Sequence, residues 1–139
     1  MAKDNKIYVL DTSAIFCLKD NEIGADKVEE ILELANKGKT RVLLSFMTLM
    51  EYLYINLMRF GEDVAHKFYL QLTLLPVSII ESDEDLRVTA AGLKSNYNIS
   101  MADSWIAATA VNNDAILVHR DSEFDELKDI VRCINLPYK

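Results

Sequence analysis

The chain of 139 residues is 50% hydrophobic and 27% charged, with only four glycines and two prolines. This composition is typical of a compact globular protein, and the length predicts one domain, residues 1–139, that buries roughly two-thirds of its unfolded surface. The net charge of −7 argues against a general nucleic-acid binder, which usually carries a basic face, but not against an enzyme whose acids are neutralised locally by metal ions.

Neither a membrane span nor a signal peptide is predicted. The longest apolar stretches, at 43–58 and 77–80, are interrupted by polar or charged residues well before they could cross a bilayer. The first six residues are polar and lack the apolar segment of a signal peptide, so we expect a cytoplasmic protein. Cys17 and Cys133 lie in apolar settings without a zinc-ligand spacing, and we interpret both as buried small hydrophobic residues.

Strand-like apolar runs alternate with helical patterns along the chain. The predicted strands are residues 7–10, 41–44, 77–80, 115–118 and 130–134. The first predicted helix starts near Ala14, and the others cover about 25–37, 45–60, 64–72, 82–97, 100–112 and 121–128. Ser45 is the expected N-cap of the third helix, and residues 82–85 have the form of a capping box for the fifth. This alternation predicts an α/β fold, with a mainly parallel central sheet of about five strands and helices on both faces.

The first predicted strand ends abruptly in Asp11, with Thr12 and Ser13 directly behind it. In an open α/β sheet, ligands bind at the carboxyl ends of the strands. Asp11 can therefore serve as the N-cap of the following helix or as a metal ligand. The second role requires other carboxylates to reach the same place.

Glu51 is the most informative acid in the middle of the chain, because it lies in a helix that is apolar almost all round. Its neighbours one helical turn away, none of them cationic, are Met47, Thr48, Tyr54 and Ile55. Glutamate is rarely buried without a partner, and burial raises its pKa unless a cation stabilises the charged form. We therefore expect a functional role for Glu51. The apolar residues in excess of one core face, which could serve a partner interface, are Tyr52, Leu53, Leu57 and Met58.

Two further acids begin predicted elements. Asp103 lies in the first turn of a helix, where it could complete an ordinary capping box. The small residues at 107–110 would let that helix pack closely on the sheet. Asp121 follows the fourth predicted strand and could also be an N-cap. Helix capping would explain these two acids and Asp11, but it does not explain Glu51.

The four acids stand in motifs that resemble those of the PIN domain. The motifs are Leu-Asp-Thr-Ser at 10–13, Glu51 within its apolar helix, Ala-Asp-Ser-Trp-Ile-Ala-Ala-Thr-Ala at 102–110 and Val-His-Arg-Asp-Ser-Glu-Phe at 118–124. Their order and spacing resemble the family over essentially the whole chain, and the small single-domain form is similar to the VapC-type toxin ribonucleases. Trp105 departs from the pattern, because the family more often has a small or aliphatic residue there.

The resemblance implies catalytic and metal-binding residues, which are Asp11, Glu51, Asp103 and Asp121, with Ser13 as a supporting hydroxyl. Glu123 and Asp125 remain alternatives to Asp121 as the last acid. Clustered carboxylates stay ionised together only when a cation offsets their repulsion, and oxygen-only ligands suit Mg²⁺ or Mn²⁺. Such ions can activate a water for hydrolysis of a phosphodiester bond.

By the same resemblance, the expected protein is a metal-dependent endoribonuclease with an RNA substrate, a homodimeric state and a small antitoxin partner. The candidate cations for the substrate phosphates are Arg120, Lys37, Lys39 and Arg41, and for each of them an ordinary solvated surface charge is the favoured interpretation. A housekeeping RNA-processing nuclease of the same fold and a non-catalytic protein-binding module remain alternatives. A dehalogenase-like phosphatase is disfavoured because Ser13 stands where its second Asp is needed, and a dinucleotide-binding domain is disfavoured because the glycine motif is absent.

Overall fold

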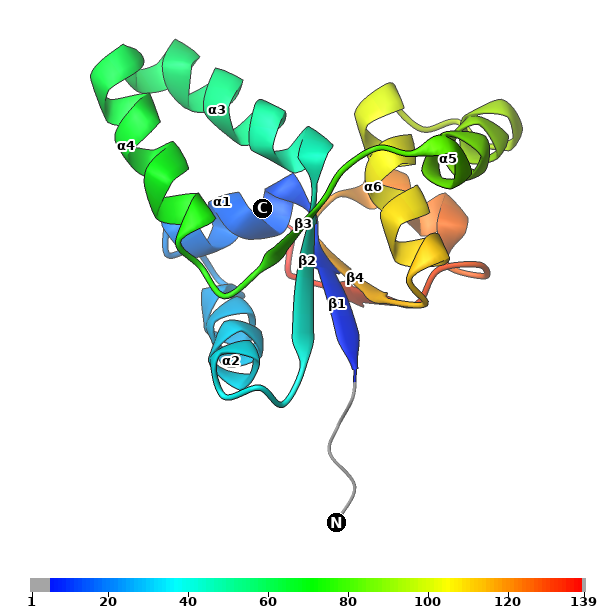
Figure 1. Ribbon diagram of the computed structural model, residues 1–139, viewed down its shortest axis with the longest axis horizontal. Coiled ribbons are helices and arrows are strands. Elements are labelled where there is room, and N and C mark those ends of the chain that lie inside the picture. The colour runs from blue at the N-terminus through cyan, green and yellow to red at the C-terminus, as the bar shows by residue number, and fades with distance from the viewer. Residues whose placement is uncertain (1–5, 139) are drawn as a thin grey trace.

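The computed structural model describes residues 6–138, which form a layered α/β structure (Figure 1). The strands within this range are β1 (Ile7–Leu10), β2 (Arg41–Ser45), β3 (Ser78–Ile80), β4 (Ile116–His119) and β5 (Cys133–Asn135). The helices are α1 (Thr12–Lys19), α2 (Ala25–Asn36), α3 (Phe46–Phe60), α4 (Glu62–Thr73), α5 (Glu84–Asn96), α6 (Met101–Asn112) and the 3₁₀ helix η1 (Ser122–Leu127).

All five strands of the sheet are parallel, in the order β3-β2-β1-β4-β5. Val9 at the centre of β1 pairs with Leu43 of β2 on one side and with Leu117 of β4 on the other. Because the strands run in one direction, the chain leaves β1, β2 and β4 at the same edge of the sheet. We call this edge the carboxyl edge, and it is where Asp11 and Asp121 follow their strands.

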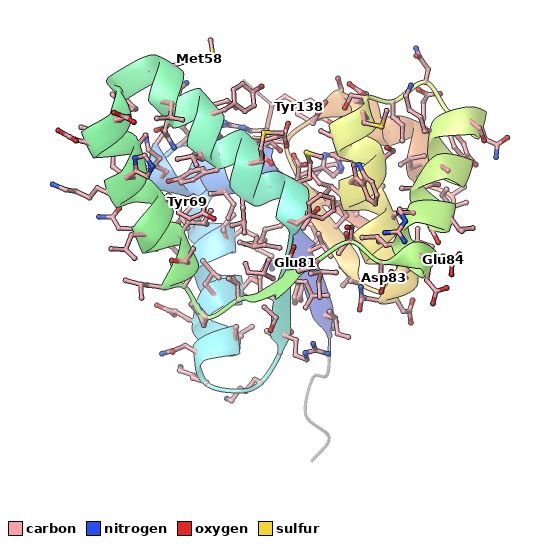
Figure 2. All side chains as sticks on the ribbon, turned by 45° about the horizontal axis from the view of Figure 1, so that its top comes forward. Met58, Tyr69, Glu81, Asp83, Glu84 and Tyr138 are labelled. Atoms are coloured by element: carbon pink, nitrogen blue, oxygen red, sulfur yellow. The ribbon has the colours of Figure 1, made fainter. Side chains whose placement is uncertain are left out.

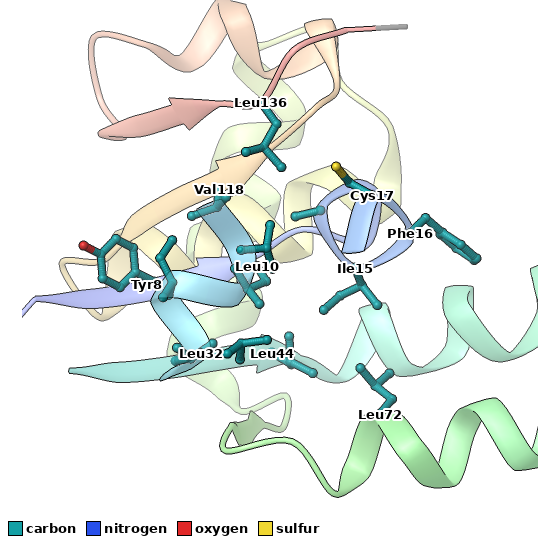
Figure 3. Close-up of a cluster of buried hydrophobic side chains, with 14 of the residues drawn as sticks. Tyr8, Leu10, Ile15, Phe16, Cys17, Leu32, Leu44, Leu72, Val118 and Leu136 are labelled. Carbon is teal, nitrogen blue, oxygen red and sulfur yellow. The ribbon is translucent and has the colours of Figure 1, made fainter. Parts of the chain in front are cut away.

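Two hydrophobic cores lie on opposite faces of the sheet. Tyr8 and Leu10 of β1 pack with α1, α2 and the inner sides of α3 and α4 (Figure 3). Val9, which points to the other face, packs with α5, α6 and η1. This alternation follows from the two-residue period of a strand, and burial on both faces explains why β1 is a continuous apolar run.

The predicted fold class is confirmed, because a five-stranded parallel sheet carries helices on both faces within the described residues. Ser45 is the N-cap of α3 as expected, with its hydroxyl oxygen accepting the N–H of Met47 at 3.1 Å. Gly61 ends that helix with a φ of 83°, a conformation that glycine adopts without the steric cost of a side chain.

Four local predictions were wrong in detail. The N-cap of α5 is Asp83, one residue beyond Ser82, because the Asp83 carboxylate accepts the N–H of Leu86 at 2.8 Å. The segment after β4 forms a 3₁₀ helix, and β5 starts at Cys133, three residues later than expected. Cys17 is buried as predicted, whereas Cys133 is only partly buried. No helix in the described part of the chain is long and apolar enough to cross a membrane.

Candidate active site

Asp11 lies at the carboxyl end of β1 and is the N-cap of α1. Its Oδ2 accepts hydrogen bonds from the backbone N–H of Ser13 at 3.0 Å and from the Ser13 hydroxyl at 2.5 Å. Asp11 is only 3% exposed, and burial raises its pKa to about 6 although both bonds from Ser13 act to lower it. The charges of Glu51 and Asp121 raise the pKa further, so both acids lie within electrostatic reach of Asp11.

Asp103, Asp121 and Glu123 form a tighter group, which we call the carboxylate cluster. One carboxylate oxygen of each residue lies within 4.8 Å of the other two. Asp103 comes from the first turn of α6, while Asp121 and Glu123 lie at the start of η1, directly after β4. The Asp121 carboxylate accepts the N–H of Glu123 at 2.9 Å, and the Glu123 carboxylate accepts the N–H of Ser100, the N-cap of α6. These bonds join the loop after β4 to the start of α6.

The electrostatics of the carboxylate cluster are unfavourable in the absence of a cation. Burial, followed by the negative charges of Asp11, Asp121 and Glu123, raises the pKa of Asp103 to about 9. Asp103 is 6% exposed, so solvent does little to screen these charges. The group therefore either holds protons at neutral pH or requires a positive ion beside it.

Glu51 reaches the same region from α3. Its Oε1 accepts a hydrogen bond of 2.7 Å from the hydroxyl of Thr12, the residue after Asp11. The Thr12 hydroxyl also lies 3.2 Å from that of Thr48, one turn before Glu51 on α3. Glu51 is outside the carboxylate cluster, but Thr12 fixes it beside Asp11. Thr12 was not predicted to have a role in the site. Its position directly after the strand-end acid Asp11 was the one feature of the sequence that pointed to such a role.

The environment of Glu51 differs from the nearly all-apolar helix surface that the sequence indicated. Glu51 is half-buried, and α3 buries a polar stripe that includes Thr48 and Asn56. Tyr52, expected at a partner interface, is 4% exposed and packs in the core. Met58 is 81% exposed and projects from the far end of α3 (Figure 2). The apolar character of the α3 sequence thus reflects an uncovered surface as well as a core face.

Comparisons with known proteins give the family of this chain. The PIN domain family model matches residues 8–130, which include Asp11, Glu51, Asp103, Asp121 and Glu123. The chain belongs to the PIN domain family. No curated protein sequence matches the chain.

Several solved structures share this PIN fold. A chain of DNA-bound VapBC from Salmonella typhimurium matches with a TM-score of 0.75 and 17% identity, covering 94% of this chain and 98% of that chain. A chain of FitAcB from Neisseria gonorrhoeae matches with a TM-score of 0.68 and 24% identity, over 92% and 96% of the two chains. VapC20 of Mycobacterium tuberculosis, a sarcin-ricin loop cleaving toxin, matches with a TM-score of 0.65 and 18% identity, over 86% and 94%. These likenesses show a common fold.

Two residues connect the strand ends of this PIN domain. The Ser13 hydroxyl donates to Asp11 and accepts the backbone N–H of Arg120 at 2.8 Å, which joins the ends of β1 and β4. His119 is buried, and burial lowers its pKa, so the ring is neutral. Its Nδ1 accepts the N–H of Asp121 at 3.1 Å and so orients the start of η1. This role of His119 could not be predicted from the sequence, because it depends on the turn that follows β4.

The candidate phosphate-binding cations are not free beside the PIN acids. Arg120 forms an ion pair of 2.6 Å with Glu22, and its side chain is only 10% exposed. Arg41 begins β2 and pairs with Ile7 at the start of β1, so it lies at the opposite edge of the sheet from Asp11. Lys37 and Lys39 precede β2 at that same opposite edge. The positions of these last three cations therefore agree with ordinary surface charges, the interpretation that the sequence favoured for them, and argue against contacts to the substrate phosphates.

Proposed function

We propose that this PIN-domain protein is a metal-dependent endoribonuclease that hydrolyses RNA phosphodiester bonds. The observation that carries the proposal is the convergence of Asp103, Asp121 and Glu123 within 4.8 Å, with Asp11 close enough to raise the pKa of Asp103. This arrangement costs free energy without a cation, so it is expected where a cation binds.

The residues fit Mg²⁺ or Mn²⁺, because they offer only carboxylate oxygens and no thiolate or imidazole ligand. The proposed metal ligands are Asp11, Glu51, Asp103 and Asp121, to which the geometry adds Glu123. A bound ion would lower the pKa of a coordinated water and neutralise charge on the scissile phosphate. In this account Ser13 and Thr12 are positioning residues, because their hydroxyls hold Asp11 and Glu51.

We further propose that the protein is the toxin of a toxin-antitoxin pair, that it consists of one domain and that it acts on RNA in the cytoplasm. The solved VapBC complexes of the same fold support an antitoxin partner. Exposed apolar side chains on α3 support a homodimer or an antitoxin contact, and they are Met50, Tyr54 and Met58. They follow a spacing of four residues and so form one stripe on the helix.

Cleavage of a structured RNA by the purified chain tests this proposal. We expect cleavage with Mg²⁺ or Mn²⁺, none with EDTA, and a loss of at least about a hundredfold for Asp103→Asn. Asp114→Asn is the matched control, because Asp114 lies in the turn before β4, at the edge of the sheet away from the cluster. Metal-independent cleavage, or full activity of Asp103→Asn, would contradict the proposal. Absence of any cleavage would favour a protein-binding module.

A further inference from the structure

Helices α5 and α6 are neighbours that cover one face of the sheet (Figure 1). The side chains between them line a groove of about 410 Å³. Its walls are largely apolar and include Met101 and Trp105 of α6. Met101 is 63% exposed and adds apolar surface at one end of the groove. The volume falls within the range of small-molecule sites.

The ring of Trp105 is held in place at this groove. It packs edge-to-face against Phe46, the first residue of α3, with the ring centroids 5.0 Å apart and the planes at 76°. Trp105 is only partly buried, so part of the indole remains open to the groove. A fixed and partly exposed indole offers a flat surface on which a nucleobase can stack.

Two cations flank this apolar groove. Arg87 and Lys94 both line it, both are exposed, and neither forms an ion pair within residues 6–138. They are seven residues apart on α5, which separates them by roughly 10 Å along the helix axis. None of the described residues that line the groove is acidic. In a chain with a net charge of −7, this local excess of positive charge is complementary to a polyanion.

The groove and the carboxylate cluster both include residues from the first turns of α6. Ser104 and Trp105 line the groove, and the residue immediately before them, Asp103, belongs to the cluster. Asp103 and Trp105 are separated by only about 3 Å along the helix axis, so a strand of RNA whose phosphate lies at the cluster could reach the groove with a neighbouring nucleotide. The first turn of α6 would contact both parts of the substrate.

We propose that the groove between α5 and α6 binds an unpaired nucleobase next to the scissile phosphate, with Trp105 as its stacking partner and Arg87 and Lys94 as contacts to the flanking phosphates. This assignment rests on the proposed ribonuclease function. It makes the substrate single-stranded at the point of cleavage, because a base can stack in the groove only when it is out of a helix.

Fluorescence tests the assignment directly, because Trp105 is the only tryptophan in the chain. The full chain is titrated with a single-stranded RNA oligomer in Ca²⁺, and a gel verifies that the RNA stays intact. We expect quenching of the Trp105 emission on binding. A parallel titration with a fluorescein-labelled oligomer gives the dissociation constant by anisotropy, independently of the tryptophan.

The double variant Arg87→Gln/Lys94→Gln tests the phosphate contacts. Both positions are exposed, so the fold is retained, and we expect about tenfold weaker binding at low salt. The slope of log affinity against log salt should fall by roughly 1.4, since each lost phosphate contact on a single strand removes about 0.7. In cleavage assays KM should rise while kcat is retained. Lys67→Gln, an exposed cation on α4, should change none of these quantities.

RNA that binds by anisotropy without altering the Trp105 emission would overturn the assignment, as would an unchanged salt slope in the double variant. If the wild type still cleaves RNA with metal, such a result refutes the subsite and leaves the ribonuclease function standing. Failure of the wild type to cleave refutes the function itself. Quenching by polyglutamate but not by RNA would also overturn the assignment, because it would identify an acidic protein segment as the occupant.

Discussion

Asp11 has two roles at the scale of the single residue, because it caps α1 and adds charge beside the carboxylate cluster. These roles can be separated by chemistry. Asparagine is as good an N-cap as aspartate but carries no charge. A substitution that keeps the cap therefore isolates the electrostatic cost of Asp11.

Asp11→Asn is expected to raise the stability of the metal-free protein at pH 8 by on the order of 1–3 kcal/mol, because it removes a buried charge whose pKa is raised to about 6. Thermal melting in EDTA measures the effect, and cleavage should be lost. Asp83→Asn is the control, because Asp83 caps α5 as an exposed residue outside the cluster (Figure 2). An unchanged or lower melting temperature for Asp11→Asn would mean that its carboxylate acts mainly as a cap.

Thr12 connects Asp11 with Glu51, because it follows Asp11 in the chain and its hydroxyl donates a hydrogen bond to Glu51. Thr12→Val removes the 2.7 Å bond to Glu51 while keeping the shape of the side chain, and it should cost about 1–2 kcal/mol of stability. The same change should weaken Mn²⁺ binding, since Glu51 loses its orientation. Thr73→Val, at an exposed hydroxyl of α4, serves as the control for both measurements. Equal Mn²⁺ affinities of wild type and Thr12→Val would show that Glu51 is not positioned in this way.

At the scale of the elements, sequence reasoning succeeded where structure is set locally. The strand at 7–10 and the cap at Ser45 follow from an apolar run and a hydroxyl residue, and both are present. The predicted parallel sheet was enough to put Lys37 and Arg41 at the amino ends of the strands, opposite Asp11, because Arg41 begins its predicted strand. The choice between Asp121 and Glu123 depends on tertiary packing, because these acids meet Asp103 only when η1 packs against the start of α6.

The exposed apolar stripe on α3 is the surface proposed for a homodimer contact. Tyr54→Ser/Met58→Gln should leave the melting temperature nearly unchanged, because both side chains are exposed, and should shift the proposed homodimer toward monomer. Light scattering over a range of concentrations measures the change. Val88→Gln, an exposed apolar position on α5, should retain the wild-type assembly. A double variant that remains fully dimeric would exclude this stripe as the dimer interface.

For the whole molecule, the carboxylate cluster makes the stability of the metal-free protein depend on pH. The folded pKa values of Asp11, about 6, and Asp103, about 9, lie above the unfolded value near 3.8. Between pH 4 and 9 the folded state therefore binds more protons than the unfolded state. Its free energy of unfolding must then fall as pH rises through this window.

We therefore expect the metal-free wild type to lose several degrees of melting temperature relative to Asp103→Asn between pH 5 and pH 8. The other titratable groups are the same in both proteins, so their effect on the melting temperature cancels in the difference between wild type and Asp103→Asn. Mn²⁺ at pH 8 should restore the wild type and leave Asp103→Asn almost unaffected. Parallel pH profiles of the two proteins would contradict a raised pKa at Asp103.

Metal binding by the carboxylate cluster is tested by a calorimetric titration of Mn²⁺ into the wild type, Asp103→Asn and the control Asp114→Asn. We expect saturable binding to the wild type and to Asp114→Asn, with affinity at least about tenfold weaker for Asp103→Asn. We also expect proton release on binding at pH 8, because the metal displaces the protons held by the cluster. Absence of binding to the wild type, or equal affinity of Asp103→Asn, would contradict a metal site at these acids.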